Sequence, residues 1–280
     1  MEQILGQGLT GVLSKIHVNL PVFMFDEYFE RFIKYGIIPE IGLDCQVLDS
    51  VSRYELRGYA DRLKASGITP SLHAPFMNLE PGSEDNAKRT EAMHYLNKAL
   101  DAVAIFRPSH VVWHTCIRRQ HPYLDPRFLN GYIRRISPVT QWFAESLMTL
   151  DARLMLENTY EPDCRLHLLL LERLKPYKTG FCLDTGHTHA FSRKPVDMWL
   201  KGGLTPYLGQ IHLHDNNGSH DAHLGAGAGT VDFKPLLEHL RQLPQRDWPL
   251  ITLEPHTQPD LLLSLKFVKN NLFSAINDSN

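Results

Sequence analysis

The chain has 280 residues, 43% of them hydrophobic, which allows one large core, and α/β barrels of about 250 residues commonly form a single domain. Its 29 basic and 31 acidic residues leave a formal charge of −2, which excludes a chain-wide field for nucleic acid or an anionic membrane. No segment approaches the roughly 20 apolar residues of a membrane span, and Met1 to Leu13 lacks the basic and apolar regions of a secretory leader. We therefore expect a cytoplasmic protein with a single domain, residues 1–280.

Short β-like runs alternate with helical periods along the whole chain, in eight rounds. This alternation predicts a parallel sheet, and eight rounds favour closure into a (β/α)8 TIM barrel over an open doubly wound sheet. The expected strands are Lys15 to Asn19, Pro39 to Asp44, Pro70 to His73, His110 to His114, Arg153 to Glu157, Gly180 to Asp184, Leu208 to His214 and Pro249 to Glu254. The expected helices are Phe25 to Lys34, Val51 to Ser66, Lys88 to Phe106, Phe128 to Leu150, Arg165 to Leu174, Val196 to Leu200, Phe233 to Leu240 and Leu261 to Leu272.

Six of the expected strands carry a histidine or a carboxylate at or near their ends. With a period of two, Glu157 shares a face with Met155, while Leu154 and Leu156 face the helices, so the polar ends point into the barrel mouth. One such histidine alone is better explained as a buried group hydrogen-bonded to backbone, but six similar strand ends favour a shared site. Carboxylate and imidazole ligands suit Zn²⁺, Mn²⁺ or Co²⁺ better than Ca²⁺. The six residues are His73, His114, Glu157, Asp184, His212 and Glu254.

Other cysteines and histidines are expected to be structural. The four cysteines lack CxxC spacing, so we expect free thiols that mostly fill the core. Three further histidines fall in helical stretches and are expected to be structural or to face solvent. These residues are Cys45, Cys116, Cys164 and Cys182, and His94, His167 and His239.

Two loops near the expected mouth are of interest. Gly225 to Gly229 lacks the GxGxxG spacing of a dinucleotide site, and we expect a flexible substrate loop whose backbone N–H groups could face an anion. Pro75 to Leu79 is expected either to supply an apolar wall to the pocket or to pack over the barrel top.

Seven motifs occur in order: Leu72-His73-Ala74-Pro75, Val112-Trp113-His114-Thr115, Leu156-Glu157-Asn158-Thr159, Leu183-Asp184-Thr185-Gly186-His187, His212-Leu213-His214-Asp215-Asn216, Asp221-Ala222-His223 and Leu253-Glu254. This series resembles the xylose isomerase-like TIM-barrel superfamily. That superfamily groups sugar and sugar-phosphate isomerases and epimerases with endonuclease IV-type enzymes of AP endonuclease family 2. The resemblance spans nearly the whole chain and implies the fold and a metal more specifically than the reaction.

For the isomerases, the resemblance implies one metal ion held by Glu157, Asp184, His212 and Glu254. Glu157 and Glu254 would then act as base and acid, moving a proton at a carbon next to an oxygen that the metal polarises. Ligation without proton transfer is the alternative for both glutamates, because a metal-bound carboxylate is a weaker base. His187 would contact substrate or a second metal.

For the endonuclease IV-type enzymes, the resemblance implies up to three zinc ions, because five more residues match the ligand positions of such a cluster. That cluster would activate a hydroxide and hold a phosphodiester for in-line displacement. The segment from Asn216 to Thr230 contains no arginine, which departs from several epimerases of the superfamily. The five residues are His73, His114, His187, Asp221 and His223.

The residues expected to grip a substrate favour a small molecule over DNA. The loop from Leu20 to Phe25 is apolar and uncharged, whereas duplex binding needs several phosphate contacts. Arg118, Asn158 and His187 are the candidate substrate contacts. We expect a divalent-metal-dependent sugar or sugar-phosphate isomerase or epimerase with one to three ions of Zn²⁺, Mn²⁺ or Co²⁺. The alternative is a multinuclear metallo-phosphodiesterase acting on a small diester or DNA, and a homo-oligomer is compatible with either.

Overall fold

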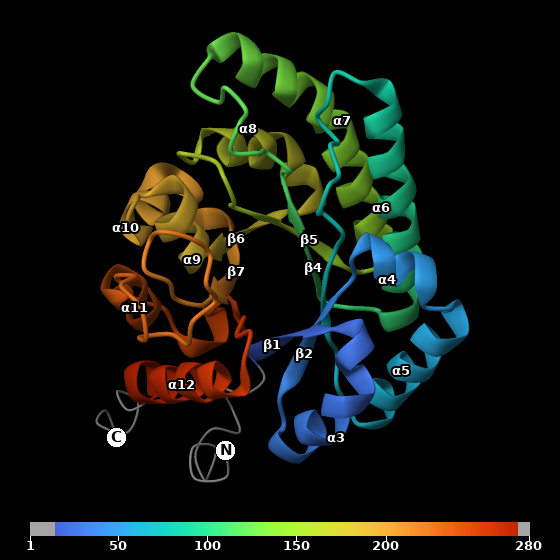
Figure 1. Cartoon of the computed structure of the whole chain (residues 1–280), viewed down its shortest axis with the longest axis vertical. Coiled ribbons are helices and arrows are strands. Elements are labelled where there is room, and N and C mark those ends of the chain that lie inside the picture. Colours follow the sequence, from blue (N-terminus) through green and yellow to red (C-terminus); the bar gives the residue numbers. More distant parts are fainter. Residues whose placement is uncertain (1–14, 274–280) are drawn as a thin grey trace.

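Eight parallel strands close into one barrel in chain order, with β8 returning to β1. The computed structural model describes residues 15–273, and Figure 1 shows the helices arranged around the outside of the strands. The prediction of a (β/α)8 TIM barrel is confirmed. The strands, labelled as in Figure 1, are β1 (Ile16–Pro21), β2 (Ile38–Gly42), β3 (Ser71–His73), β4 (His110–His114), β5 (Arg153–Glu157), β6 (Gly180–Asp184), β7 (Leu208–Leu213) and β8 (Leu250–Leu253).

The helices follow the strands as expected for this fold. Among the described residues, none of them combines the length and the apolar character that a membrane crossing requires. Met1 to Leu13, on which the expectation about a leader rests, lies outside the described residues. The α-helices are α3 (Phe25–Tyr35), α4 (Cys45–Ser50), α5 (Arg53–Ala65), α6 (Asn86–Phe106), α7 (Pro126–Thr149), α8 (Arg165–Leu174), α9 (Thr185–His187), α10 (Val196–Trp199), α11 (Lys234–Gln242) and α12 (Gln258–Val268).

The helix expected from Val51 to Ser66 starts later than predicted and is preceded by the separate short helix α4. Val51 has an extended backbone, with φ −88° and ψ 122°. Ser52 caps α5, because its side chain accepts a hydrogen bond from the Glu55 N–H while the Glu55 carboxylate accepts one from the Ser52 N–H at 2.8 Å. This capping box sets the start of α5.

Strand boundaries were predicted well for β4, β5 and β6, whose ends match the expected ones. In contrast, β7 and β8 each end one residue earlier than predicted. His214 and Glu254 therefore lie just beyond their strands, at the mouth of the barrel.

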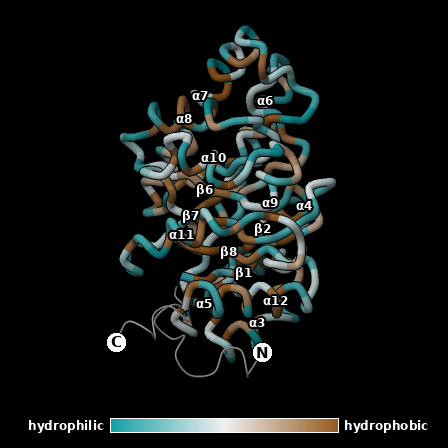
Figure 2. Tube along the Cα trace, turned by 90° about the vertical axis from the view of Figure 1, so that its left-hand side faces the viewer, coloured by the Kyte–Doolittle hydropathy of each residue, from teal (hydrophilic) through white to brown (hydrophobic). Residues whose placement is uncertain are grey.

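The main core lies between the strands and the surrounding helices. Leu154 and Leu156 of β5 are buried there, as the strand period predicted, and Leu96 and Val103 of α6 pack into the same core. Figure 2 shows hydrophobic segments gathered around β6, β7 and β8, with hydrophilic segments on the outer loops. Burial of these faces stabilises the barrel independently of any polar site at its mouth.

The inside of the barrel has an apolar half and a polar half. Val112, Met155 and Cys182, on β4, β5 and β6, form a small buried apolar cluster of their own. On the other side, hydrogen bonds join strands that are not neighbours in the sheet and so cross the interior. TIM-barrel interiors are usually filled by branched apolar side chains, so this polar half is unusual. Its members are His17, Glu40, Ser71, Gln210 and Thr252, all buried.

A pH dependence of stability follows from His17. Burial lowers the pKa of His17 from 6.5 to about 4, against the opposing effect of Glu40. Between these two pH values the unfolded chain binds a proton that the folded chain does not, so stability falls as the pH drops. We expect this residue to contribute about 2 to 3 kcal/mol to the loss of unfolding free energy between about pH 7 and pH 4.5.

Urea unfolding of the chelator-treated protein and of His17→Gln at the two pH values measures this contribution. The variant should lose less stability on acidification, because glutamine does not titrate. The other histidines cancel in the difference between the two proteins. Equal losses in both proteins would contradict the expectation.

Candidate functional site

The residues predicted to bind metal all meet at the mouth of the barrel. Most are buried, while Asp221 and His223 are partly buried. The carboxyl ends of β3 to β8 supply six of them, the first turn after β6 supplies His187, and the loop after β7 supplies Asp221 and His223. The full set is His73, His114, Glu157, Asp184, His187, His212, Asp221, His223 and Glu254.

An inner group forms around the carboxylate of Glu157. Its Oε2 lies 3.2 Å from His73 Nε2, 3.1 Å from His114 Nε2 and 3.3 Å from His212 Nδ1. Glu254 Oε1 lies 3.1 Å from the same His212 Nδ1. The two glutamates therefore flank one imidazole nitrogen, each from a different strand end.

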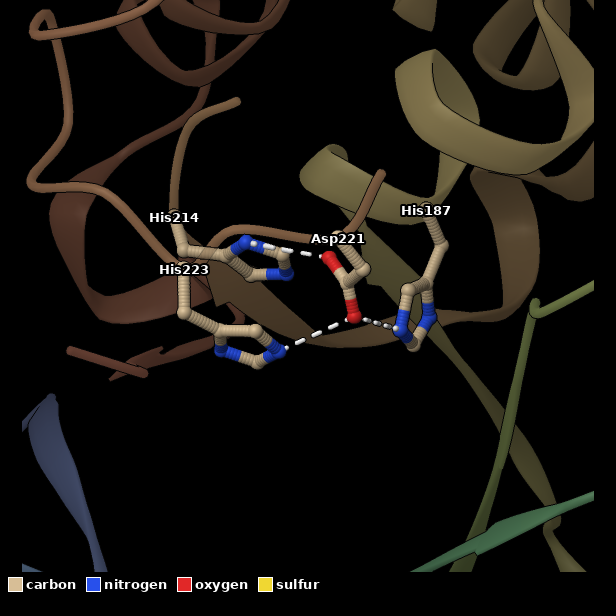
Figure 3. Close-up of side chains that lie close together, drawn as sticks. All are labelled: His187, His214, Asp221 and His223. Atoms are coloured by element: carbon tan, nitrogen blue, oxygen red, sulfur yellow. Dashed lines mark hydrogen bonds and ion pairs between the residues drawn. The ribbon is translucent and has the colours of Figure 1, made fainter. Parts of the chain in front are cut away.

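An outer group forms around Asp221, as Figure 3 shows. Asp221 Oδ2 lies 3.2 Å from His187 Nε2 and 3.0 Å from His223 Nε2. The other nitrogen of His187, Nδ1, is 3.2 Å from Glu157 Oε1. The ring of His187 thus lies between the carboxylates of the inner and outer groups.

Backbone carbonyls fix three of these histidines in one orientation. The Nδ1 atoms of His73, His187 and His223 donate to the carbonyl oxygens of Ala74, Asn158 and Glu254, at 3.0, 2.8 and 2.9 Å. A carbonyl only accepts, so this network assigns the proton to Nδ1 and leaves a lone pair on Nε2. Each of these Nε2 atoms faces a carboxylate oxygen, so the lone pair of the nitrogen and that of the oxygen point at each other. A proton or a cation must lie between them, and this arrangement is typical of metal-binding histidines.

Unpartnered buried atoms at the mouth support the same interpretation. His114 Nε2, His212 Nδ1 and Asp221 Oδ1 are buried without a hydrogen-bond partner, although all of them face groups of the site. Burial raises the pKa of Glu157, but the neighbouring His114 and His212 lower it by more. The resulting pKa of Glu157 is well below its usual value. The nitrogen and oxygen donors fit a divalent cation such as Zn²⁺, Mn²⁺ or Co²⁺.

His214 belongs to the site but was not among the predicted residues. Its Nε2 lies 3.0 Å from both carboxylate oxygens of Asp184, and its ring stacks on His223 with centroids 3.9 Å apart and planes 1° apart. A metal lies near the plane of each imidazole that binds it, so these two parallel rings cannot share one ion. His214 Nε2 thus contacts Asp184, while its Nδ1 is buried without a hydrogen-bond partner, 3.7 Å from Asp221 Oδ1, so His214 is a further residue that could hold an ion. Its position two residues after His212, at the end of the expected strand from Leu208 to His214, was the available signal.

Gly186 makes room for this histidine. A Cβ atom at position 186 would lie 1.9 Å from His214 Cε1, which is far inside van der Waals contact. The glycine after Asp184-Thr185 is therefore required by close packing at the site.

Glu40 is the second residue that sequence reasoning missed. Its side chain is fully buried inside the barrel, and its Oε1 lies 3.0 Å from His212 Nε2. Burial raises the pKa of Glu40, but the contact with His212 more than offsets this, and the resulting value is about 2. An acidic residue in the interior of the expected strand from Pro39 to Asp44 was the only signal.

The predicted substrate contacts lie in three different environments. Arg118, on the loop after β4, pairs with Glu80 at 3.2 Å. Asn158 is fully buried, and its amide accepts from the Asp184 N–H at 2.9 Å and donates to the Asp184 carbonyl at 3.0 Å. Asn158 thus holds the end of β6 in place, while His187 lies within the site itself.

Three backbone amides of the loop from Gly225 to Gly229 are bound by carboxylates of the protein itself. The prediction that Gly225 to Gly229 presents N–H groups to an anion is wrong for the amides of Gly225, Gly227 and Gly229. Asp260 accepts from Gly225, and Asp215 accepts from both Gly227 and Gly229.

In the loop after β3, Phe76 stacks on His114 with ring centroids 3.8 Å apart. Phe191 stacks in turn on His187, with centroids 5.0 Å apart. The loop from Pro75 to Leu79 therefore places an aromatic ring against the histidines His73 and His114 of the candidate site.

Comparison with known proteins identifies the family. The family model for xylose isomerase-like TIM barrels matches residues 40–270. The chain belongs to this family. Protein MJ1311 of Methanocaldococcus jannaschii is 25% identical to the chain over 185 residues, which cover 61% of the chain and 60% of MJ1311.

Solved structures resemble this family member over most of its length. The TTHB071 protein of Thermus thermophilus, whose crystal was soaked with ZnCl2, is 26% identical with a TM-score of 0.77, covering 93% of this chain and 98% of that one. A D-tagatose 3-epimerase-like protein is 19% identical with a TM-score of 0.78, covering 94% and 98%. This second likeness shows the fold alone.

Proposed function

We propose that this chain is a divalent-metal-dependent isomerase or epimerase of a sugar or sugar phosphate. The observation that carries the proposal is the position of Glu157 and Glu254. Both carboxylates lie within 3.3 Å of His212 Nδ1, and they come from β5 and from just beyond β8. Membership of the xylose isomerase-like family and the likeness to a D-tagatose 3-epimerase-like protein support the substrate class.

In this proposal, Glu157, Asp184, His212 and Glu254 hold the ion. When bound, the ion polarises a carbonyl or hydroxyl oxygen of the substrate. Glu157 and Glu254 then remove and return a proton at the neighbouring carbon, one on each side of the substrate.

The remaining residues position the substrate. His187 supplies a hydrogen-bonding or second-metal contact, and Asn158 and His214 keep Asp184 in place. Phe76 and Phe191 offer aromatic faces on which the C–H groups of a sugar ring can pack. Arg118 would contact a phosphate or carboxylate at the rim only by leaving Glu80.

A metallo-phosphodiesterase is the second candidate, and the outer group favours it. Asp221 between His187 and His223 offers ligands for a further ion, as in-line displacement at a phosphodiester requires. A small diester suits this mouth better than DNA, because Arg118 is already paired and the loop from Leu20 to Phe25 is uncharged.

Isotopes from solvent separate the two reactions. With sugar substrates in D2O, we expect deuterium at a substrate carbon, because the proton moved by Glu157 and Glu254 exchanges with water. With phosphodiesters in H2¹⁸O, attack by hydroxide would place ¹⁸O in the phosphate product. Mass spectrometry of the products reads both labels. Solvent oxygen in the product without carbon exchange would overturn the isomerase proposal in favour of the second candidate.

A further inference from the structure

The polar half of the barrel interior converges on Glu40. Its Oε2 accepts hydrogen bonds from Ser71 Oγ at 2.9 Å, from Thr252 Oγ1 at 3.2 Å and from Gln210 Nε2. Its Oε1 is buried and accepts no hydrogen bond of regular geometry from the described residues, and it lies 3.0 Å from His212 Nε2. Side chains from three strands of the barrel, β3, β7 and β8, thus direct donors at one buried carboxylate.

The direction of these hydrogen bonds follows from the chemistry of the groups. An ionised carboxylate only accepts, so the hydroxyl of Ser71 donates to Glu40. The Ser71 oxygen is then free to accept the Nδ1 proton of His17, which lies 2.8 Å away. Gln210 Nε2 also lies 3.4 Å from His212 Nε2, but its two protons are donated to Glu40 Oε2 and Thr252 Oγ1. The proton between His212 Nε2 and Glu40 Oε1 is therefore on His212.

The other nitrogen of His212 is thereby committed to the metal centre. With its proton on Nε2, His212 presents the lone pair of Nδ1 to Glu254 Oε1 and Glu157 Oε2, at 3.1 and 3.3 Å. We infer that Glu40 is a positioning residue, which fixes the ring and the protonation of His212 so that Nδ1 is the metal ligand. This inference rests on the metal site of the proposed function.

The fold itself does not require a carboxylate at this position. Val112, Met155 and Cys182 fill the opposite half of the same interior with apolar groups. Replacing buried ionic groups by apolar ones of similar volume is often neutral or stabilising, so stability alone does not explain Glu40. Carboxylates that accept a proton from a metal-bound histidine are known to raise metal affinity.

Glu40→Gln tests the inference with little change in shape. An amide has one accepting and one donating end, so it cannot accept from both His212 and the donors at Oε2. If its NH2 faces His212, the ring must place its proton on Nδ1, which blocks that nitrogen as a ligand. We expect Zn²⁺ affinity, measured by competition with a chromophoric chelator, to fall about 10- to 100-fold. The visible absorption spectrum of the Co²⁺-loaded protein should also change, because it reports ligand geometry.

Glu161→Gln is the matched control. Glu161 is also fully buried near the mouth. Among residues 15–273, the hydrogen bonds to its carboxylate come from the hydroxyls of Thr115 and Thr159 and from the Thr159 N–H. A glutamine amide can replace this carboxylate, because the Thr115 hydroxyl can rotate and accept a hydrogen bond from the amide NH2. The control should keep the Zn²⁺ affinity and the Co²⁺ spectrum of the parent protein.

A measurement on the unaltered protein does not depend on how the variant folds. Nitrogen-15 NMR of the histidine rings in the Zn²⁺-loaded protein should show His212 with its proton on Nε2 and zinc on Nδ1. Zinc on Nε2 would overturn the inference, and so would a folded Glu40→Gln variant with unchanged affinity and spectrum. These results leave the proposed function intact. An unaltered protein that binds no Zn²⁺, Mn²⁺ or Co²⁺ would overturn the proposed function and this inference together.

Discussion

Replacing Glu157 with alanine is expected to remove bound metal and to reduce activity by at least about 10³-fold, while the barrel stays folded. The Glu157 carboxylate is shared by the histidines of both groups, since its oxygens lie within 3.3 Å of His73, His114, His187 and His212. Its loss removes an anion from every ion that the site could hold. The core between strands and helices does not include this side chain, so the fold should persist.

Elemental analysis of protein purified without chelator, with circular dichroism for the fold, checks this expectation. Glu161→Gln serves again as the control, because it changes a buried carboxylate of the same loop region without touching a ligand side chain. Full metal occupancy in folded Glu157→Ala would contradict the ligand assignment. A chelator-treated parent protein should lose activity to the same extent and recover it with added metal.

The barrel could be predicted because its signals are local. β4, β5 and β6 each form a short run with a polar residue at the carboxyl end, so their bounds follow from the sequence alone. The convergence of the strand ends then follows from the closed parallel topology, which brings every such end to one mouth. The six ligands at strand ends could be placed for that reason, whereas His187, Asp221 and His223 were placed by the resemblance to the family.

Glu40 could not be interpreted in the same way, because its partners depend on closure of the barrel. Gln210 and Thr252 lie 170 and 212 residues further along the chain, and they meet Glu40 only across the interior. A local pattern shows an acid in a strand but not what faces it.

The loop from Gly225 to Gly229 illustrates a related limit. Its composition suggested free backbone amides, but the acceptors that bind them are Asp215 and Asp260, which come from outside the loop. Whether a backbone N–H is available to a ligand is decided by such tertiary contacts.

The number of bound ions is expected to exceed one, and His223→Ala should remove one of them. The site contains the four carboxylates of Glu157, Asp184, Asp221 and Glu254, whose negative charge a single divalent ion would balance only in part. Each transition ion takes about four to six donors, and the nine predicted side chains exceed the shell of one ion. His223 lies 3.0 Å from Asp221, so its removal affects the outer group and leaves the inner ligands in place.

His256→Ala is the matched control for His223→Ala. The ring of His256 stacks on the other face of His223, with centroids 4.1 Å apart. The His256→Ala substitution removes one imidazole from the same stack, but Asp221 keeps its contacts with His187 and His223. All bound ions should therefore remain in this control. A parent protein with one ion, unchanged by His223→Ala, would contradict the outer site.

The activity of His223→Ala then shows whether the reaction needs the outer ion. An isomerase needs only the ion held by Glu157, Asp184, His212 and Glu254, so His223→Ala should keep proton exchange within about tenfold of the parent protein. A phosphodiesterase needs further positive charge to stabilise the attacking and leaving oxygens, so the same loss should reduce hydrolysis by several orders of magnitude. His223 donates to the backbone carbonyl of Glu254, and Asp221 reaches Glu157 only through the ring of His187. Removing the imidazole of His223 therefore leaves both glutamate carboxylates in contact with His212, and we expect the first result.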